Sequence, residues 1–170
     1  MMKLRSKILA GMSLVAVAGT VAATGLTSAS ASSAAGAGRS GFEFFQLMKT
    51  VPDPAPGSII ATGLFTAGGV DHPGSKVDSV VFPDGTFKIA HSPGTGTPRF
   101  NPKTCLSVFV FNGTYRLGHG TGAYAGISGH GIYRLNILAV GARNSAGQCS
   151  NNLPPVAYQQ IIRAQGPVRL

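Results

Sequence analysis

The chain has 170 residues and a formal net charge of +9, from 14 Lys and Arg residues against 5 Asp and Glu residues. This length accommodates one domain, and the basic residues are scattered singly without interleaved aromatic residues, which argues against a nucleic-acid partner. A basic surface permits a general affinity for acidic wall polymers or membrane surfaces, although it more often reflects solubility.

The N-terminus has the pattern of a secretory signal peptide. Three basic residues within positions 1–7 precede an apolar run over residues 8–21, and Ala29-Ser30-Ala31 offers a cleavage site. The run is too short, and too rich in small residues at its end, for a stable transmembrane anchor. We therefore expect removal of residues 1–31, and a secreted, extracellular protein of 139 residues with a formal charge of +6 and no membrane anchor.

The mature chain is predicted to be all-β. Residues 32–40 are mostly small and are expected to form a flexible N-terminus, followed by one β-domain over residues 41–170. No stretch of this domain shows helical spacing of apolar residues over three turns. Strands are expected at residues 41–50, 58–67, 76–82, 86–91, 106–115, 132–140 and 156–165, with loops at 68–75, 92–104 and 141–155. Such short strands separated by turn signals are typical of a barrel or a sandwich.

The most informative stretch is Gly118-x-Gly120-Thr121-Gly122-x-Tyr124-x-Gly126-x-x-Gly129-x-Gly131, with six glycines around one tyrosine. Two β-type runs joined by such a bend make a hairpin that curves tightly at one end, as barrel closure requires. The stretch resembles the Gly-Gly-Thr-Gly-x-Phe/Tyr-x-Gly-x-x-Gly segment of dirigent proteins and of the allene oxide cyclase-like barrels. His119 departs from that pattern, because it stands where the segment has its first glycine.

The resemblance implies a fold, a cavity and an assembly. The fold is an eight-stranded antiparallel β-barrel of the calycin-like type around a hydrophobic cavity, and many members of this superfamily form homotrimers. The resemblance covers only 14 residues and carries over no catalytic residue, so an isomerase or cyclase activity is implied by the fold alone. The sequence therefore favours a protein without catalysis.

Cys105 and Cys149 are expected to form a disulfide bond, since an even number of cysteines in an exported chain favours pairing. Closing this span of 44 residues would stabilise the fold by roughly 3–4 kcal/mol. The alternatives are metal ligands or a catalytic thiol, and neither cysteine has the Cys-x-x-Cys spacing or a histidine within four residues.

Three polar residues are candidates for binding a ligand inside the barrel. Asp78, His91 and Tyr133 each alternate in phase with large apolar residues of their own strands. A carboxylate, an imidazole and a phenol can thus line one apolar cavity and orient a ligand there. The alternative is that Asp78 and His91 lie at strand ends in water and that Tyr133 is an ordinary core tyrosine.

Residues 106–111 are apolar on both faces of their predicted strand, which a strand with one face in water would not tolerate. We expect the outer face to be covered, either by another subunit or by the N-terminal segment.

No cofactor and no metal site are expected. The glycine stretch opens no helix and lies in no βαβ unit, so it is not a dinucleotide loop. His119 and His130 could hold an ion only with a third ligand, which the sequence does not supply, and the alternative is two solvated histidines.

The sequence is best interpreted as a small secreted β-barrel that binds a small hydrophobic molecule in its cavity or acts at the cell envelope. One alternative is an isomerase or cyclase that steers a reactive intermediate. Another is an extracellular inhibitor or interaction protein that presents the loop at residues 92–104.

Overall fold

The structure is a computed structural model that describes residues 38–150 and 152–170. The predicted signal peptide, residues 1–31, and most of the predicted flexible segment, residues 32–40, lie outside the described residues. Within the described ranges, no helix is long and apolar enough to cross a membrane.

The described residues form an all-β domain, as predicted. Its elements are β1 (Ser40–Lys49), β2 (Gly57–Gly63), β3 (Ala67–His72), β4 (Val77–Phe82), β5 (Gly85–His91), β6 (Thr95–Asn101), β7 (Leu106–Gly118), the 3-10 helix η1 (Gly122–Tyr124), β8 (Ser128–Val140) and β9 (Ala157–Arg169). The seven predicted strands form close to the expected positions. Those predicted at residues 76–82 and 86–91 pair as the hairpin β4–β5 around Pro83-Asp84-Gly85.

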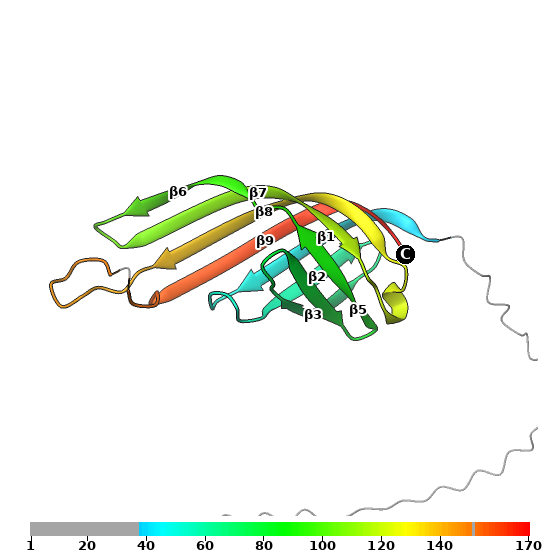
Figure 1. The fold of residues 1–170 in the computed structure, drawn as a ribbon, viewed down its shortest axis with the longest axis horizontal. Helices are drawn as coiled ribbons and strands as arrows, with labels where there is room; N and C mark the ends of the chain where they lie inside the picture. Colours follow the sequence, from blue (N-terminus) through cyan, green and yellow to red (C-terminus); the bar gives the residue numbers. More distant parts are fainter. Residues whose placement is uncertain (1–37, 151) are drawn as a thin grey trace, which may run out of the picture. The chain divides into compact units, whose positions relative to one another are not determined.

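The sheet closes on itself. Its strand order is β5-β4-β3-β2-β1-β9-β8-β7-β6, all neighbours pair antiparallel, and β5 pairs in addition with β7 (Figure 1). In the described part of the chain, eight strands therefore form a closed antiparallel barrel, with β6 as one extra strand outside it. The predicted eight-stranded antiparallel β-barrel is confirmed.

Three long strands extend the sheet beyond the barrel. Strands β7, β8 and β9 have 13 residues each, whereas β4 has six. At about 3.3 Å per residue, the long strands project past the barrel, and β6 pairs with the projecting half of β7 (Figure 1). We call this part the extension, made of residues 95–101, 106–112, 136–140 and 157–159.

The first half of β7 lies in this extension. Its residues 106–111 are all half-buried, and β6 and β8 flank them within the sheet. The prediction that a second subunit or the N-terminal segment covers the outer face of this strand stays a prediction.

Aromatic side chains close the end of the barrel next to the glycine hairpin. Tyr124 of η1 is buried, and its ring centroid lies 5.1 Å from that of Phe65, 5.6 Å from that of Phe82 and 5.5 Å from that of Phe87. Burying one such ring stabilises a fold by about 1.5–3 kcal/mol. The tyrosine within the glycine stretch is therefore part of the hydrophobic core.

The glycines let this hairpin lie directly on its neighbours. Gly122 has a φ of +59°, and a Cβ at this position would lie 2.2 Å from the carbonyl oxygen of Asp84 in the β4–β5 turn. A Cβ at Gly120 would lie 1.7 Å from the carbonyl oxygen of Tyr124. Only glycine fits such close backbone approaches. His119 has a φ of +55°, so the turn keeps a left-handed conformation although the residue is not glycine.

Two segments expected as loops contain strands. Residues 68–75 hold most of β3, where a Cβ at Gly69 would lie 2.1 Å from the carbonyl oxygen of Val81 on β4. Glycine here permits close strand pairing, although its low strand propensity favours a loop. Residues 92–104 hold β6, whose Pro98 is tolerated because β6 is an edge strand.

The last strand is longer than expected, since β9 continues through Gly166 and Pro167 to Arg169. Pairing with β1 continues along this segment, with Phe42 opposite Pro167, whereas the pairing with β8 is interrupted there. Proline has no N–H to donate to a ladder. At Pro167, β9 therefore stays paired with β1 on one side and is not paired with β8 on the other.

The predicted disulfide bond between Cys105 and Cys149 is confirmed. It joins the residue before β7 to the loop after β8, with 5.4 Å between the two Cα atoms. The bond excludes the alternatives of metal ligands and a catalytic thiol, and it indicates an oxidising compartment.

Candidate functional site

The barrel holds a cavity at the end opposite to the glycine hairpin. Its volume is about 340 Å³, and residues 73–76 between β3 and β4 and Ser92–Gly94 after β5 border it. The apolar part of its wall comes from Phe45, Leu47, Ile89, Leu135 and Ile162. A volume of this order accommodates a small organic molecule, and the apolar wall favours one with little polarity.

The three predicted ligand-binding residues come from three strands and all line this cavity. His91 Nε2 lies 3.4 Å from Asp78 Oδ1, and the His91 ring centroid lies 6.5 Å from that of Tyr133. Asp78 Oδ1 also accepts the backbone N–H of Gly74 at 2.8 Å, and the Tyr133 hydroxyl donates to the carbonyl oxygen of Ser92 at 2.8 Å. Asp78 is 8% exposed, so it does not lie in water. That the three residues bind a ligand stays a prediction.

A second carboxyl group, that of Asp71, lies deeper in the wall of the same cavity. Asp71 is 2% exposed, and its Oδ1 has no hydrogen-bond partner among the described residues. Burial raises the pKa of Asp71 from 3.8 to about 7, and the negative charge of Asp78 adds to this shift, whereas Lys49 opposes it. Lys49 itself pairs with Asp53 at the cavity rim. Asp71 can therefore hold or release a proton near neutral pH.

A buried phenol also lines the cavity. Tyr115 is 2% exposed, and within the described part of the chain its hydroxyl has no hydrogen-bond partner. Burial raises its pKa to about 12, with a further contribution from the charge of Glu43, so the hydroxyl stays protonated. It can donate a hydrogen bond to a ligand in the cavity.

Glu43 lies outside the cavity lining, on the inner face of β1, and is fully buried. Its Oε2 accepts the backbone N–H of Phe65 at 3.1 Å, while Oε1 has no partner among the residues described. Burial raises the pKa of Glu43, and the hydrogen bond from Phe65 partly opposes this. Glu43 therefore positions the chain after β2.

Sequence reasoning missed Asp71, Tyr115 and Glu43. The sequence predicts a loop at Asp71, because the glycines before it obscure strand β3. A signal was present for the other two, since Glu43 alternates in phase with Phe45 and Tyr115 alternates in phase with Leu117. The same alternation that selected Asp78 and Tyr133 would have selected them.

The two histidines of the glycine stretch are both exposed, His119 in the turn and His130 on β8. The described residues contain no group of three His, Cys, Asp or Glu side chains that could hold a metal ion. The arrangement agrees with the alternative of two solvated histidines.

Comparison with protein-family models finds no match, and comparisons with curated proteins and with solved structures find none either. The likeness to dirigent and allene oxide cyclase-like proteins therefore rests on the glycine stretch and on the barrel. What the structure defines is a class: a closed, disulfide-bonded antiparallel β-barrel with an apolar cavity lined by a few buried polar groups.

Proposed function

We propose that this protein binds a small, predominantly apolar molecule in the barrel cavity and does so outside the cell. The leader-like N-terminus and the disulfide bond support an extracellular location. The cavity volume of about 340 Å³ and its apolar wall support a small ligand.

The observation that carries the proposal is the pair of unsatisfied polar groups in the cavity wall. In the described part of the chain, Asp71 Oδ1 and the Tyr115 hydroxyl are buried and lack partners. Each such group costs a fold about 1–3 kcal/mol, which a ligand that bonds to it would recover. The ligand is therefore an apolar molecule with at least one hydrogen-bonding group near its buried end.

The test uses the neutral fluorescent probe N-phenyl-1-naphthylamine with the purified, disulfide-bonded protein. Ala164 faces the cavity, and Ala164→Phe fills it, whereas Gln159→Phe adds a similar ring at an exposed position of β9. We expect the wild type and Gln159→Phe to bind the probe alike, and Ala164→Phe to bind at least tenfold more weakly. Equal binding by both variants, or no binding by the wild type, would contradict the proposal.

Catalysis is the second candidate, and Asp71 is the observation that favours it. A carboxyl group with a pKa of about 7 in an apolar cavity is suited to general acid–base chemistry at neutral pH. Its activity would be an isomerisation or cyclisation of the bound molecule. A compound extracted from the natively purified protein should be converted by the wild type and left unchanged by Asp71→Asn. Binding without conversion by either protein would leave binding as the function.

A further inference from the structure

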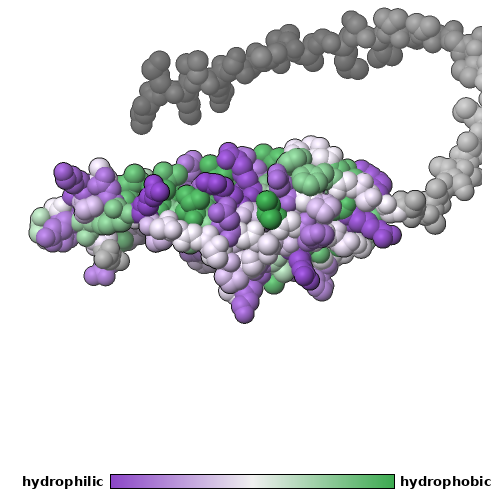
Figure 2. All heavy atoms as spheres, turned by 90° about the horizontal axis from the view of Figure 1, so that it is seen from above, coloured by the Kyte–Doolittle hydropathy of each residue, from purple (hydrophilic) through white to green (hydrophobic). Residues whose placement is uncertain are grey.

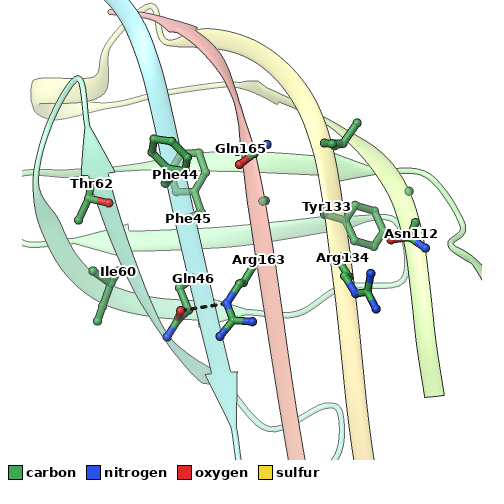
Figure 3. A pocket seen from close by; sticks show the side chains of 13 residues that line it. Phe44, Phe45, Gln46, Ile60, Thr62, Asn112, Tyr133, Arg134, Arg163 and Gln165 are labelled. Carbon is green, nitrogen blue, oxygen red and sulfur yellow. Dashed lines mark hydrogen bonds between the residues drawn. The ribbon is translucent and has the colours of Figure 1, made fainter. Parts of the chain in front are cut away.

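The outer face of β2, β1, β9 and β8 carries two arginines that lie opposite each other. Arg163 on β9 pairs in register with Arg134 on β8, and Gln46 on β1 lies on the other side of Arg163. Figure 3 shows these three side chains in a row across the strands, with the Gln46 oxygen 3.5 Å from Arg163 Nε. Like charges in directly opposite positions of a sheet destabilise it. In the described part of the chain neither arginine pairs with a carboxylate.

Large apolar side chains stand next to this arginine pair. Phe44, Ile60 and Ile132 line the same recess, and Phe42 lies two residues from Phe44 on β1. The four side chains are between 45% and 59% exposed, and the rings of Phe42 and Phe44 lie 5.2 Å apart. In Figure 2, hydrophobic and hydrophilic residues are interspersed over the face that is visible. Contiguous exposed apolar groups on a folded domain mark an interaction surface.

A second copy of the chain does not complement this surface. All 5 Asp and Glu residues of the sequence lie in the described ranges, and Glu43, Asp71 and Asp78 are buried. Of the remaining two, Asp53 already pairs with Lys49, and Asp84 is a single exposed carboxylate in the β4–β5 turn, too little for two adjacent arginines. A symmetric contact would also place the arginine pair of one copy against that of the other. The counter-charge must therefore come from a different molecule.

We propose that this face binds the anionic surface of a phospholipid membrane. A bilayer of acidic phospholipids supplies phosphates for the guanidinium groups and an apolar interior for the phenylalanine and isoleucine side chains. A hydrated acidic polymer would pair with the arginines but would leave the apolar side chains in water. The inference does not depend on a ligand in the barrel cavity, because these side chains point outward from the barrel.

The test is flotation of the purified, disulfide-bonded protein with vesicles of phosphatidylcholine alone or mixed with phosphatidylglycerol. We expect binding to the mixed vesicles only, and weaker binding at higher ionic strength. Arg134→Gln with Arg163→Gln should lower the partition coefficient roughly 25-fold, because each basic residue at an anionic surface contributes about fivefold. The matched control, Arg99→Gln with Lys103→Gln, removes two exposed charges elsewhere and should change it less than threefold.

The variant Phe44→Ser tests whether a membrane, and not another partner, occupies this face. Circular dichroism verifies that each variant is folded. If a membrane is the partner, Phe44→Ser binds the mixed vesicles at least fivefold more weakly while both arginines remain. If the two charge variants lost vesicle binding equally, net charge alone would explain the binding, and the proposal would be overturned. Binding to phosphatidylcholine alone, no binding by the wild type, or a dimer that Phe44→Ser converts to a monomer would overturn it as well.

Discussion

Asp71 is a titratable residue in a largely apolar environment. Its carboxyl group lies in an apolar wall beside the negative charge of Asp78, and in the described residues Oδ1 has no partner. The ionised form is therefore disfavoured in the folded protein, whereas the unfolded chain ionises near its usual pKa of 3.8. Folding consequently takes up a proton at this residue between about pH 4 and pH 7.

We expect Asp71→Asn to stabilise the protein at pH 8 and to have little effect at pH 4. A folded pKa of about 7 above an unfolded pKa of 3.8 gives stability that is fully present below pH 4 and is lost as the pH rises to 7. At about 1.4 kcal/mol per pKa unit, removal of the charge should raise the free energy of unfolding at pH 8 by roughly 2–4 kcal/mol.

Urea denaturation at both pH values measures this difference. The control is Asp84→Asn, the same change at an exposed turn position, which should not stabilise the protein at pH 8 because no buried charge is removed. A stability difference between Asp71→Asn and the wild type that is the same at pH 4 and pH 8 would show that the Asp71 carboxyl group is not buried as the structure has it.

The sequence predicted part of this site because strand alternation is a local property. Asp78 and Tyr133 lie on strands that are rich in β-branched or large apolar residues, so their phase could be read directly. The inward position of Asp71 cannot be predicted, because its strand begins with Ala67, Gly68 and Gly69, which have low strand propensity. This strand is recognised only from its pairing with β2 and β4. Its buried charge is a consequence of tertiary packing, which no local pattern expresses.

At the scale of elements, the glycine hairpin lies against the β4–β5 turn at one end of the barrel, and this contact determines how that end is packed. The Cβ position of Gly85 would lie 2.2 Å from the carbonyl oxygen of Thr121, and that of Gly122 would lie 2.2 Å from the carbonyl oxygen of Asp84. The backbones of the β4–β5 turn and of the start of η1 therefore lie so close together that neither segment can carry a side chain at these two positions. This contact places Tyr124 in the core beneath it.

Gly120→Ala should destabilise the fold by roughly 2–3 kcal/mol, since its methyl group would lie 1.7 Å from the carbonyl oxygen of Tyr124 and backbone must move. Gly68→Ala is the matched control, because a Cβ there meets nothing within 4 Å and no positive φ is required. Thermal unfolding compares the two variants with the wild type. If the Gly120→Ala protein were as stable as Gly68→Ala, Gly120 would not lie against the carbonyl oxygen of Tyr124 as described.

The strand pairings that the sequence predicts are those between strands that are near in the chain. The β4–β5 and β7–β8 hairpins have turn signals between two apolar runs, so sequence determines both the strands and their pairing. Strand β6 lacks such a pattern, since all seven of its residues are exposed and it contains Pro98. It forms because the projecting half of β7 offers an unpaired edge, which is a property of the assembled sheet.

In the whole domain, most acidic residues are buried in the barrel and most basic residues lie on the surface. Three of the five acidic residues of the chain, all within the described ranges, are buried in the barrel, while the lysines and arginines are mainly exposed. Copies of this protein therefore repel each other over most of their surface. Any self-association has to use apolar area, and the extension supplies it through Leu106, Val108 and Val110 on the outer face of β7.

We expect native mass spectrometry of the purified protein to give a mass three times that of the mature chain, as the resemblance to the dirigent and allene oxide cyclase-like barrels implies. Association through the extension buries apolar area between like-charged subunits, so the trimer should become more stable as ionic strength rises. Vesicle binding has the opposite salt dependence, which distinguishes the two surfaces. Val108→Gln with Val110→Gln should give monomers, whereas Thr114→Gln, exposed on the same strand beside the barrel, should not. A wild-type protein that stays monomeric at high salt would contradict the predicted homotrimer and leave the apolar extension to a different partner.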